Sequence, residues 1–99
     1  MNFEEFCQCV ETCDTPEKSW ADALQSLFWE RKGEWEKAHE QVLGKKIPEA
    51  AWVHGYLHRK EGDLGNAEFW YTRAGQKAPR GDFAEEWEEI TKTLLERYF

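Results

Sequence analysis

The last segment of the chain constrains the fold most, because its apolar residues recur with the period of an α-helix. From Phe83 to Tyr98 they stand at positions i, i+4, i+7, i+11 and i+15. Asp82, with Glu85 three residues later, has the spacing of a capping box that starts a helix. No stretch alternates polar and apolar residues over the length of a strand. We therefore expect an all-α fold.

Capping residues, glycines and prolines divide the rest of the chain. Asn2 with Glu5 predicts a first helix, and Thr15 followed by Pro16 predicts the start of a second. The loops are short, so consecutive helices are expected to be antiparallel neighbours. We expect about six helices. The predicted units are a helix over about 2–13, a hairpin over about 16–44, a hairpin over about 48–75 and a helix over about 82–98, all in one domain, 1–99.

Composition narrows the class of protein. The chain has 99 residues, is 40% hydrophobic and holds six tryptophans, which suits a small globular domain. Its start, MNFEEF, is acidic and does not resemble a signal peptide, and no apolar run is long enough to cross a membrane. We expect a cytoplasmic protein without membrane contact. Cys7, Cys9 and Cys13 lack the spacing of a zinc site and are interpreted as small buried residues.

Charge is spread unevenly. The net charge of −7 argues against general nucleic-acid binding. Residues 45–80, however, carry seven Lys and Arg against four acids, on a body that is otherwise strongly acidic. A basic middle can attract an anionic partner, and it can equally form ion pairs inside a helix bundle.

A weak internal repeat is visible at an offset of 29 residues. GEWEKA, from Gly33 to Ala38, aligns with GDLGNA, and a small residue stands twelve positions before the alanine in each unit: Ser26 and Gly55. Such residues let two helices approach closely. The pattern resembles the tetratricopeptide repeat, a helix–turn–helix unit. The matching positions in the second unit are Gly55, Ala67, Tyr71, Ala74 and Pro79. The resemblance implies TPR-like hairpins closed by the two terminal helices.

The string HRKEGDLGNAEFWYTRAG also resembles the signature of a family of small, uncharacterised bacterial proteins. The resemblance covers residues 35–80 or so and is most specific in its second half. It implies a helical fold and no particular reaction.

Two groups of residues between 48 and 75 are candidate binding sites for a protein or peptide. Trp52, Tyr56 and Arg59 fall on the first helix of the hairpin, where an aromatic pair beside a base suits an acidic or phosphorylated ligand. The alternative is that the two aromatic residues are core. Asn66, Trp70 and Arg73 share the outer face of the second helix, which Asp63 is expected to cap. His58 completes the predicted set of contacts.

Histidines raise a second possibility. His54, His58 and Glu61 stand at i, i+4 and i+7, a spacing that can hold a divalent metal. His39 can supply a third imidazole, but nothing in the sequence places it there. Structural histidines are the favoured interpretation, so no metal or other cofactor is expected.

Catalytic motifs are absent, because the chain has neither a nucleophile elbow nor a phosphate-binding glycine loop. An acid–base set of His58, Glu61 and Tyr71 is the remaining enzymatic alternative. The favoured hypothesis is a non-enzymatic helical module that binds a protein or peptide. The alternatives are a small metal-dependent or acid–base enzyme and a structural homo-oligomer.

Overall fold

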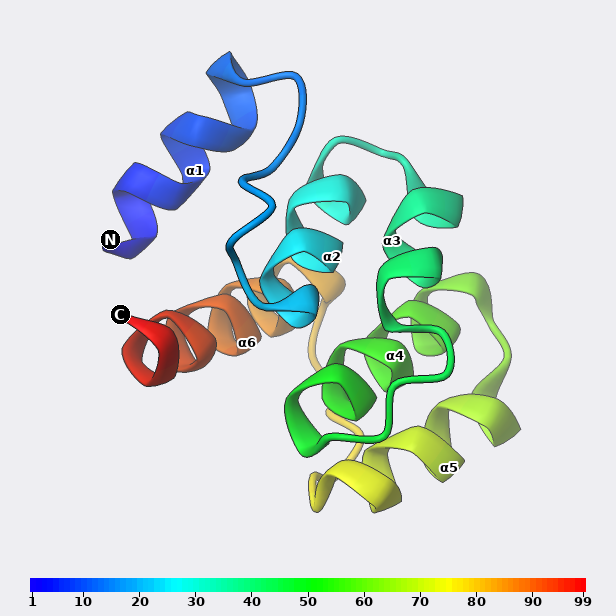
Figure 1. Ribbon diagram of the computed structural model, residues 1–99. Helices are drawn as coiled ribbons and strands as arrows, with labels where there is room; N and C mark the ends of the chain where they lie inside the picture. The colour runs from blue at the N-terminus through cyan, green and yellow to red at the C-terminus, as the bar shows by residue number, and fades with distance from the viewer.

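The computed structural model describes residues 1–99 and consists of six α-helices without strands (Figure 1). The helices are α1 (Phe3–Thr12), α2 (Asp22–Arg31), α3 (Trp35–Val42), α4 (Pro48–Glu61), α5 (Leu64–Ala74) and α6 (Phe83–Tyr98). The predicted all-α class is confirmed. None of these helices combines the length and the apolar character required to span a lipid bilayer.

The helices pack as two consecutive pairs with a cover at each end of the chain. α2 pairs with α3, α4 pairs with α5, and α6 runs against both α2 and α4 (Figure 1). α1 packs on α6, so the two ends of the chain are neighbours, and Met1 and Phe99 line the same hollow.

Most helix starts lie where the capping residues predict them. Asn2 and Glu5 form a reciprocal capping box on α1, with hydrogen bonds of 2.8 and 2.9 Å. Asp63 accepts a hydrogen bond from the backbone N–H of Asn66 at the start of α5. Asp82 caps α6 in the same way, by accepting from the backbone N–H of Glu85. α4 begins at Pro48, whose missing N–H costs nothing in the first turn.

The predicted start of the second helix is wrong. α2 begins at Asp22, whereas Thr15 and Pro16 belong to an irregular segment that leads into it. Pro16 is buried there. The side-chain amide of Gln25 donates to the carbonyl oxygens of Trp20, at 2.8 Å, and Lys18, at 3.3 Å. These bonds satisfy carbonyl groups that a helix would otherwise pair internally, so the segment is stable without being helical.

One hydrophobic core joins all six helices. The apolar stripe of α6 supplies Trp87, Ile90 and Leu94, while the two ends of that stripe, Phe83 and Tyr98, are exposed. The other members come from α1 to α5, from the segment before α2 and, with Leu95, from α6 itself. They are Phe6, Val10, Trp20, Ala23, Leu24, Leu27, Phe28, Ala38, Val42, Ala50, Trp52, Val53, Tyr56, Leu57, Ala67, Tyr71 and Leu95.

The small residues of the internal repeat lie at close contacts between helices. The hydroxyl of Ser26 donates to the carbonyl oxygen of Ala38 at 2.7 Å, inside the α2–α3 pair. In the α4–α5 pair, a methyl group on Gly55 would lie 3.1 Å from both Cγ and the backbone nitrogen of Tyr71. A methyl group there would force α5 to shift by a few tenths of an ångström, so the glycine lets α5 lie close to α4.

Candidate functional site

Three histidines converge where α3 meets α4. His54 and His58 lie one turn apart on α4 with their rings stacked, and the ring centroids are 4.8 Å apart. His39 of α3 lies across them, with its ring centroid 4.9 Å from His54 and 5.2 Å from His58. One nitrogen of each ring lies within 4.8 Å of the others. The packing of α3 on α4 thus supplies the position of His39, which the sequence does not.

Two tryptophans enclose this cluster. Trp70 of α5 stacks on the ring of His54 at a centroid distance of 4.1 Å, and Trp35 stacks on His39 at 4.8 Å. The Trp35 indole also donates a hydrogen bond of 3.0 Å to the carbonyl oxygen of Leu57, which anchors α3 to α4. The histidines therefore lie between two aromatic walls from different helices.

Burial keeps part of the cluster neutral. His54 is 2% exposed, and burial, followed by the neighbouring charges of His58 and His39, lowers its pKa to about 4. Burial and the charge of His58 also lower the pKa of the half-buried His39. The Nε2 atoms of His39 and His54 are 3.1 Å apart and share one hydrogen bond. Both rings are thus available as neutral nitrogen ligands at pH 7.

His54 also has a polar atom without a partner. Its Nδ1 is buried and makes no hydrogen bond. Leaving such an atom unsatisfied costs about 1–3 kcal/mol of folding free energy, whichever tautomer the ring adopts. The hydrogen bond that Nε2 of His54 shares with His39 leaves this cost at Nδ1 in place.

Glu61 lies beside the cluster and orients one ring. Its carboxylate is 2.5 Å from Nδ1 of His58, which leaves Nε2 as the free nitrogen of that ring. The structure therefore brings together the three residues of the predicted His–His–Glu spacing, with Glu61 behind His58. A carboxylate oxygen of Asp63 lies within 4.8 Å of the same pair, but this carboxylate caps α5.

Arg59 has a different position from the one that the sequence suggests. Its guanidinium donates to the carboxylate of Glu86 at 2.7 Å and to the Gly81 carbonyl oxygen at 2.6 Å, and it lies over the ring of Phe83. The hydroxyl of Tyr71 donates to the same Glu86. Burial raises the pKa of both Glu86 and Tyr71, so Tyr71 keeps its proton in neutral solution. Arg59 therefore holds α6 in place.

Trp52 and Tyr56, the other predicted contacts on α4, are core residues. Both side chains are buried in the hydrophobic cluster and present no surface to a ligand. Their spacing places them on the inner face of α4, which α2 and α6 cover. Lys60, next to Arg59 in sequence, pairs with the buried Glu30.

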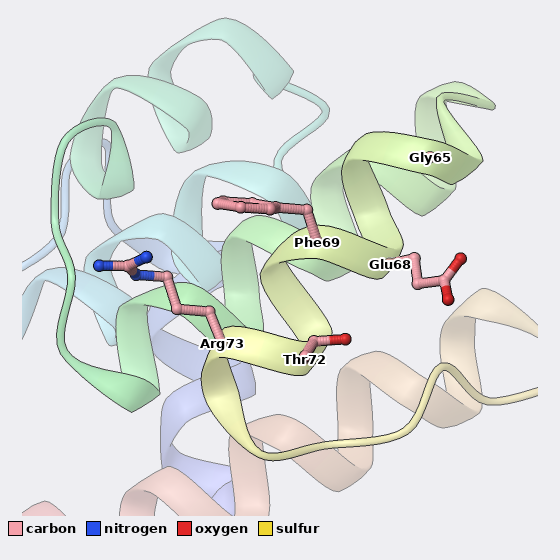
Figure 2. Close-up of a pocket in the computed structure, with 5 residues that line it drawn as sticks. All are labelled: Gly65, Glu68, Phe69, Thr72 and Arg73. Atoms are coloured by element: carbon pink, nitrogen blue, oxygen red, sulfur yellow. The ribbon is translucent and has the colours of Figure 1, made fainter.

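The outer face of α5 is uncovered. Figure 2 shows Phe69 and Arg73 extending on one side of the helix and Glu68 with Thr72 on the other, below Gly65. These five residues line a hollow of about 450 Å³. Phe69 is 55% exposed, and the guanidinium of Arg73 makes no ion pair. The sequence indicates Arg73 as a contact but not Phe69, although a helical wheel of α5 places Phe69 beside Arg73.

The remaining predicted residues have local roles. The Asn66 side chain donates to the carboxylate of Asp63 at 3.2 Å, within the first turn of α5. Tyr71 bonds Glu86, so the structure does not group it with His58 and Glu61 as an acid–base set. The sulfurs of Cys9 and Cys13 lie 3.2 Å apart; burial and that hydrogen bond raise the pKa of Cys9 to about 11.

Comparisons with protein-family models, with curated proteins and with solved structures found no match to this chain.

Proposed function

We propose that the protein is a non-enzymatic interaction module that binds an acidic segment of a protein or peptide along the outer face of α5. The observation that carries this proposal is an exposed aromatic side chain next to a guanidinium that makes no ion pair. Phe69 and Arg73 stand one turn apart on the same side of the helix (Figure 2). An aromatic contact beside a guanidinium is a typical anchor for a peptide that carries an apolar residue next to a carboxylate.

The surroundings of α5 support a ligand that lies along the helix. A second hollow, of about 620 Å³, separates α5 from the loop that leads to α6, and it shares Glu68 and Thr72 with the first. Lys77 of that loop lines it. A peptide segment that crosses Glu68 and Thr72 would contact both hollows. It would meet the basic side chains of Arg73 and Lys77, although the net charge of the whole chain is −7.

The set of contacts is narrower than the sequence suggests. Arg59 is occupied by Glu86, and Trp52 and Tyr56 are in the core, so none of these three is a contact residue in this proposal. Of the predicted contacts, Trp70 and Arg73 are kept in this proposal, and the structure adds Phe69. Structural self-association through the same face is the alternative, because an exposed aromatic patch can equally meet a second copy.

The test is site-specific photo-crosslinking in cells. p-Benzoylphenylalanine in place of Phe69 is expected to give an adduct with one partner, and Arg73→Glu in the same chain is expected to abolish it. Leu43, which is 57% exposed at the end of α3 and not on α5, is the matched control position. Equal adducts at 69 and 43, or an adduct that survives Arg73→Glu, would contradict the proposal. An adduct of twice the chain's mass would instead assign the face to self-association.

A further inference from the structure

We propose that His39, His54 and His58 form a zinc-binding site in which Glu61 orients His58. The three nitrogens come from two helices, and their neighbourhood is fixed by the packing of α3 on α4. This inference is independent of the proposed function of α5.

Two of the three nitrogens already lie close to the spacing that a shared ion requires, and the His58 nitrogen lies within 4.8 Å of both. Ligands about 2.0–2.1 Å from a tetrahedral zinc lie about 3.3–3.4 Å from one another. The Nε2 atoms of His39 and His54 are 3.1 Å apart, so they need to separate by only a few tenths of an ångström. Zinc bound between these two nitrogens would give two coordinate bonds in place of their one shared hydrogen bond.

The third nitrogen is prepared by Glu61. Because its carboxylate holds Nδ1 of His58, the proton lies on that side and the lone pair is left on Nε2. A carboxylate behind a coordinating imidazole is the usual arrangement around zinc, where it fixes the tautomer and raises the basicity of the ligand. The ligands of this cluster are three, which leaves the fourth tetrahedral position to water.

An alternative set, His58 with Glu61 and Asp63, fits less well. Its two carboxylates are on exposed residues, and Asp63 already accepts hydrogen bonds from Asn66 as the cap of α5. Imidazole nitrogens also suit zinc better than they suit the magnesium or calcium that carboxylates prefer. The histidine set therefore defines the site.

Titration of the purified full-length chain with zinc chloride, by calorimetry, tests the proposal. We expect one equivalent to bind. His39→Ala should weaken binding by more than about 100-fold, and Glu61→Gln should weaken it by about 10- to 100-fold, the range found when a carboxylate behind a ligand is removed. His39 is half-buried at the edge of the cluster, so its removal is the variant most compatible with folding. Circular dichroism of each variant checks that it is folded.

Two controls separate this site from other zinc ligands on the chain. Glu40→Ala changes an exposed carboxylate next to His39 and should leave the affinity unchanged. Replacing Cys7, Cys9 and Cys13 together by serine removes the only thiols, and binding should survive. The proposal is overturned if wild-type protein takes up no stoichiometric zinc, if His39→Ala binds as tightly as wild type, or if binding disappears with the thiols. Cobalt substitution gives a separate readout, since the intensity of its visible bands distinguishes four-coordinate from six-coordinate metal.

Discussion

Arg59 of α4 lies 2.7 Å from the carboxylate of Glu86 on α6, and this ion pair links the two helices. The side chain of Glu86 is 3% exposed and that of Arg59 is 15% exposed, so water screens the pair little. Tyr71 of α5 donates to the other carboxylate oxygen. One buried acid thus joins three helices, and Arg59 supplies the charge that makes its burial tolerable.

Removing Arg59 should therefore destabilise the fold strongly. Arg59→Ala leaves the buried Glu86 carboxylate without its counter-charge, and such losses cost about 3–5 kcal/mol. The free energy of unfolding in urea at neutral pH measures it. Arg97→Ala is the matched control, because Arg97 pairs with Glu49 at the surface and such pairs contribute less than about 1 kcal/mol. Equal losses of unfolding free energy in the two variants would show that the Arg59–Glu86 pair is not shielded from water.

Stability should depend on pH through Glu86. Burial raises the pKa of Glu86 above its ordinary value of 4.5, and the bonds from Tyr71 and Arg59 offset this only in part. The folded state then binds that proton more tightly than the unfolded chain does. The resulting stabilisation is complete below the unfolded pKa and is lost as pH rises through the folded pKa. The cost of Glu86→Gln, measured by urea unfolding, should accordingly be larger at pH 4 than at pH 7. A cost that grows towards pH 7 would contradict this sign.

Two glycine substitutions should have opposite effects. Gly55→Ala places a methyl group 3.1 Å from the backbone nitrogen of Tyr71, so α5 has to move away by a few tenths of an ångström, and overpacking of this kind costs about 1–3 kcal/mol. Gly65→Ala, in the first turn of α5, meets no atom within 4 Å and should add up to about 1 kcal/mol through helix propensity. Thermal unfolding of both variants is the measurement. A stabilising Gly55→Ala would mean that α4 and α5 can separate without penalty.

His54→Phe should separate folding from metal binding. The change keeps a ring for Trp70 to stack on and removes the buried nitrogen that has no partner. The half-buried His39 can turn its free nitrogen to water. We expect the metal-free variant to be as stable as wild type or up to about 1 kcal/mol more stable, while zinc binding is lost. Destabilisation by more than about 2 kcal/mol would identify His54 as a structural residue.

Features of the fold that depend on neighbours in sequence were predictable. The caps at Asn2, Asp63 and Asp82 each bond a backbone N–H three residues later. The residues that predict each helix start therefore lie within one helical turn. Pro16 shows the limit of such a signal. A threonine followed by proline suits a helix start, but the side chain of Gln25, farther along the chain, stabilises an irregular segment in its place.

The candidate sites depend on contacts between distant residues and were predictable only in part. His54 and His58 share a helix face by spacing alone, whereas His39 joins them only after α3 packs on α4. Arg59 illustrates the converse. Its sequence neighbourhood is basic and aromatic, which suggests a binding surface, but the residue that pairs with it lies 27 positions away. A charge can be assigned to a site only when its partner is known.

Trp70 occupies the boundary between the two proposed sites. One face of its indole lies on His54, and the ring of Phe69 meets it edge-on at a centroid distance of 5.2 Å. Indole emission responds to the charge and rigidity of whatever touches the ring. Trp70 is therefore an intrinsic fluorescent probe that reports on zinc through His54 and on a docked peptide through Phe69. A variant that keeps Trp70 and replaces the other five tryptophans by phenylalanine would let both binding events be followed in one sample by intrinsic fluorescence.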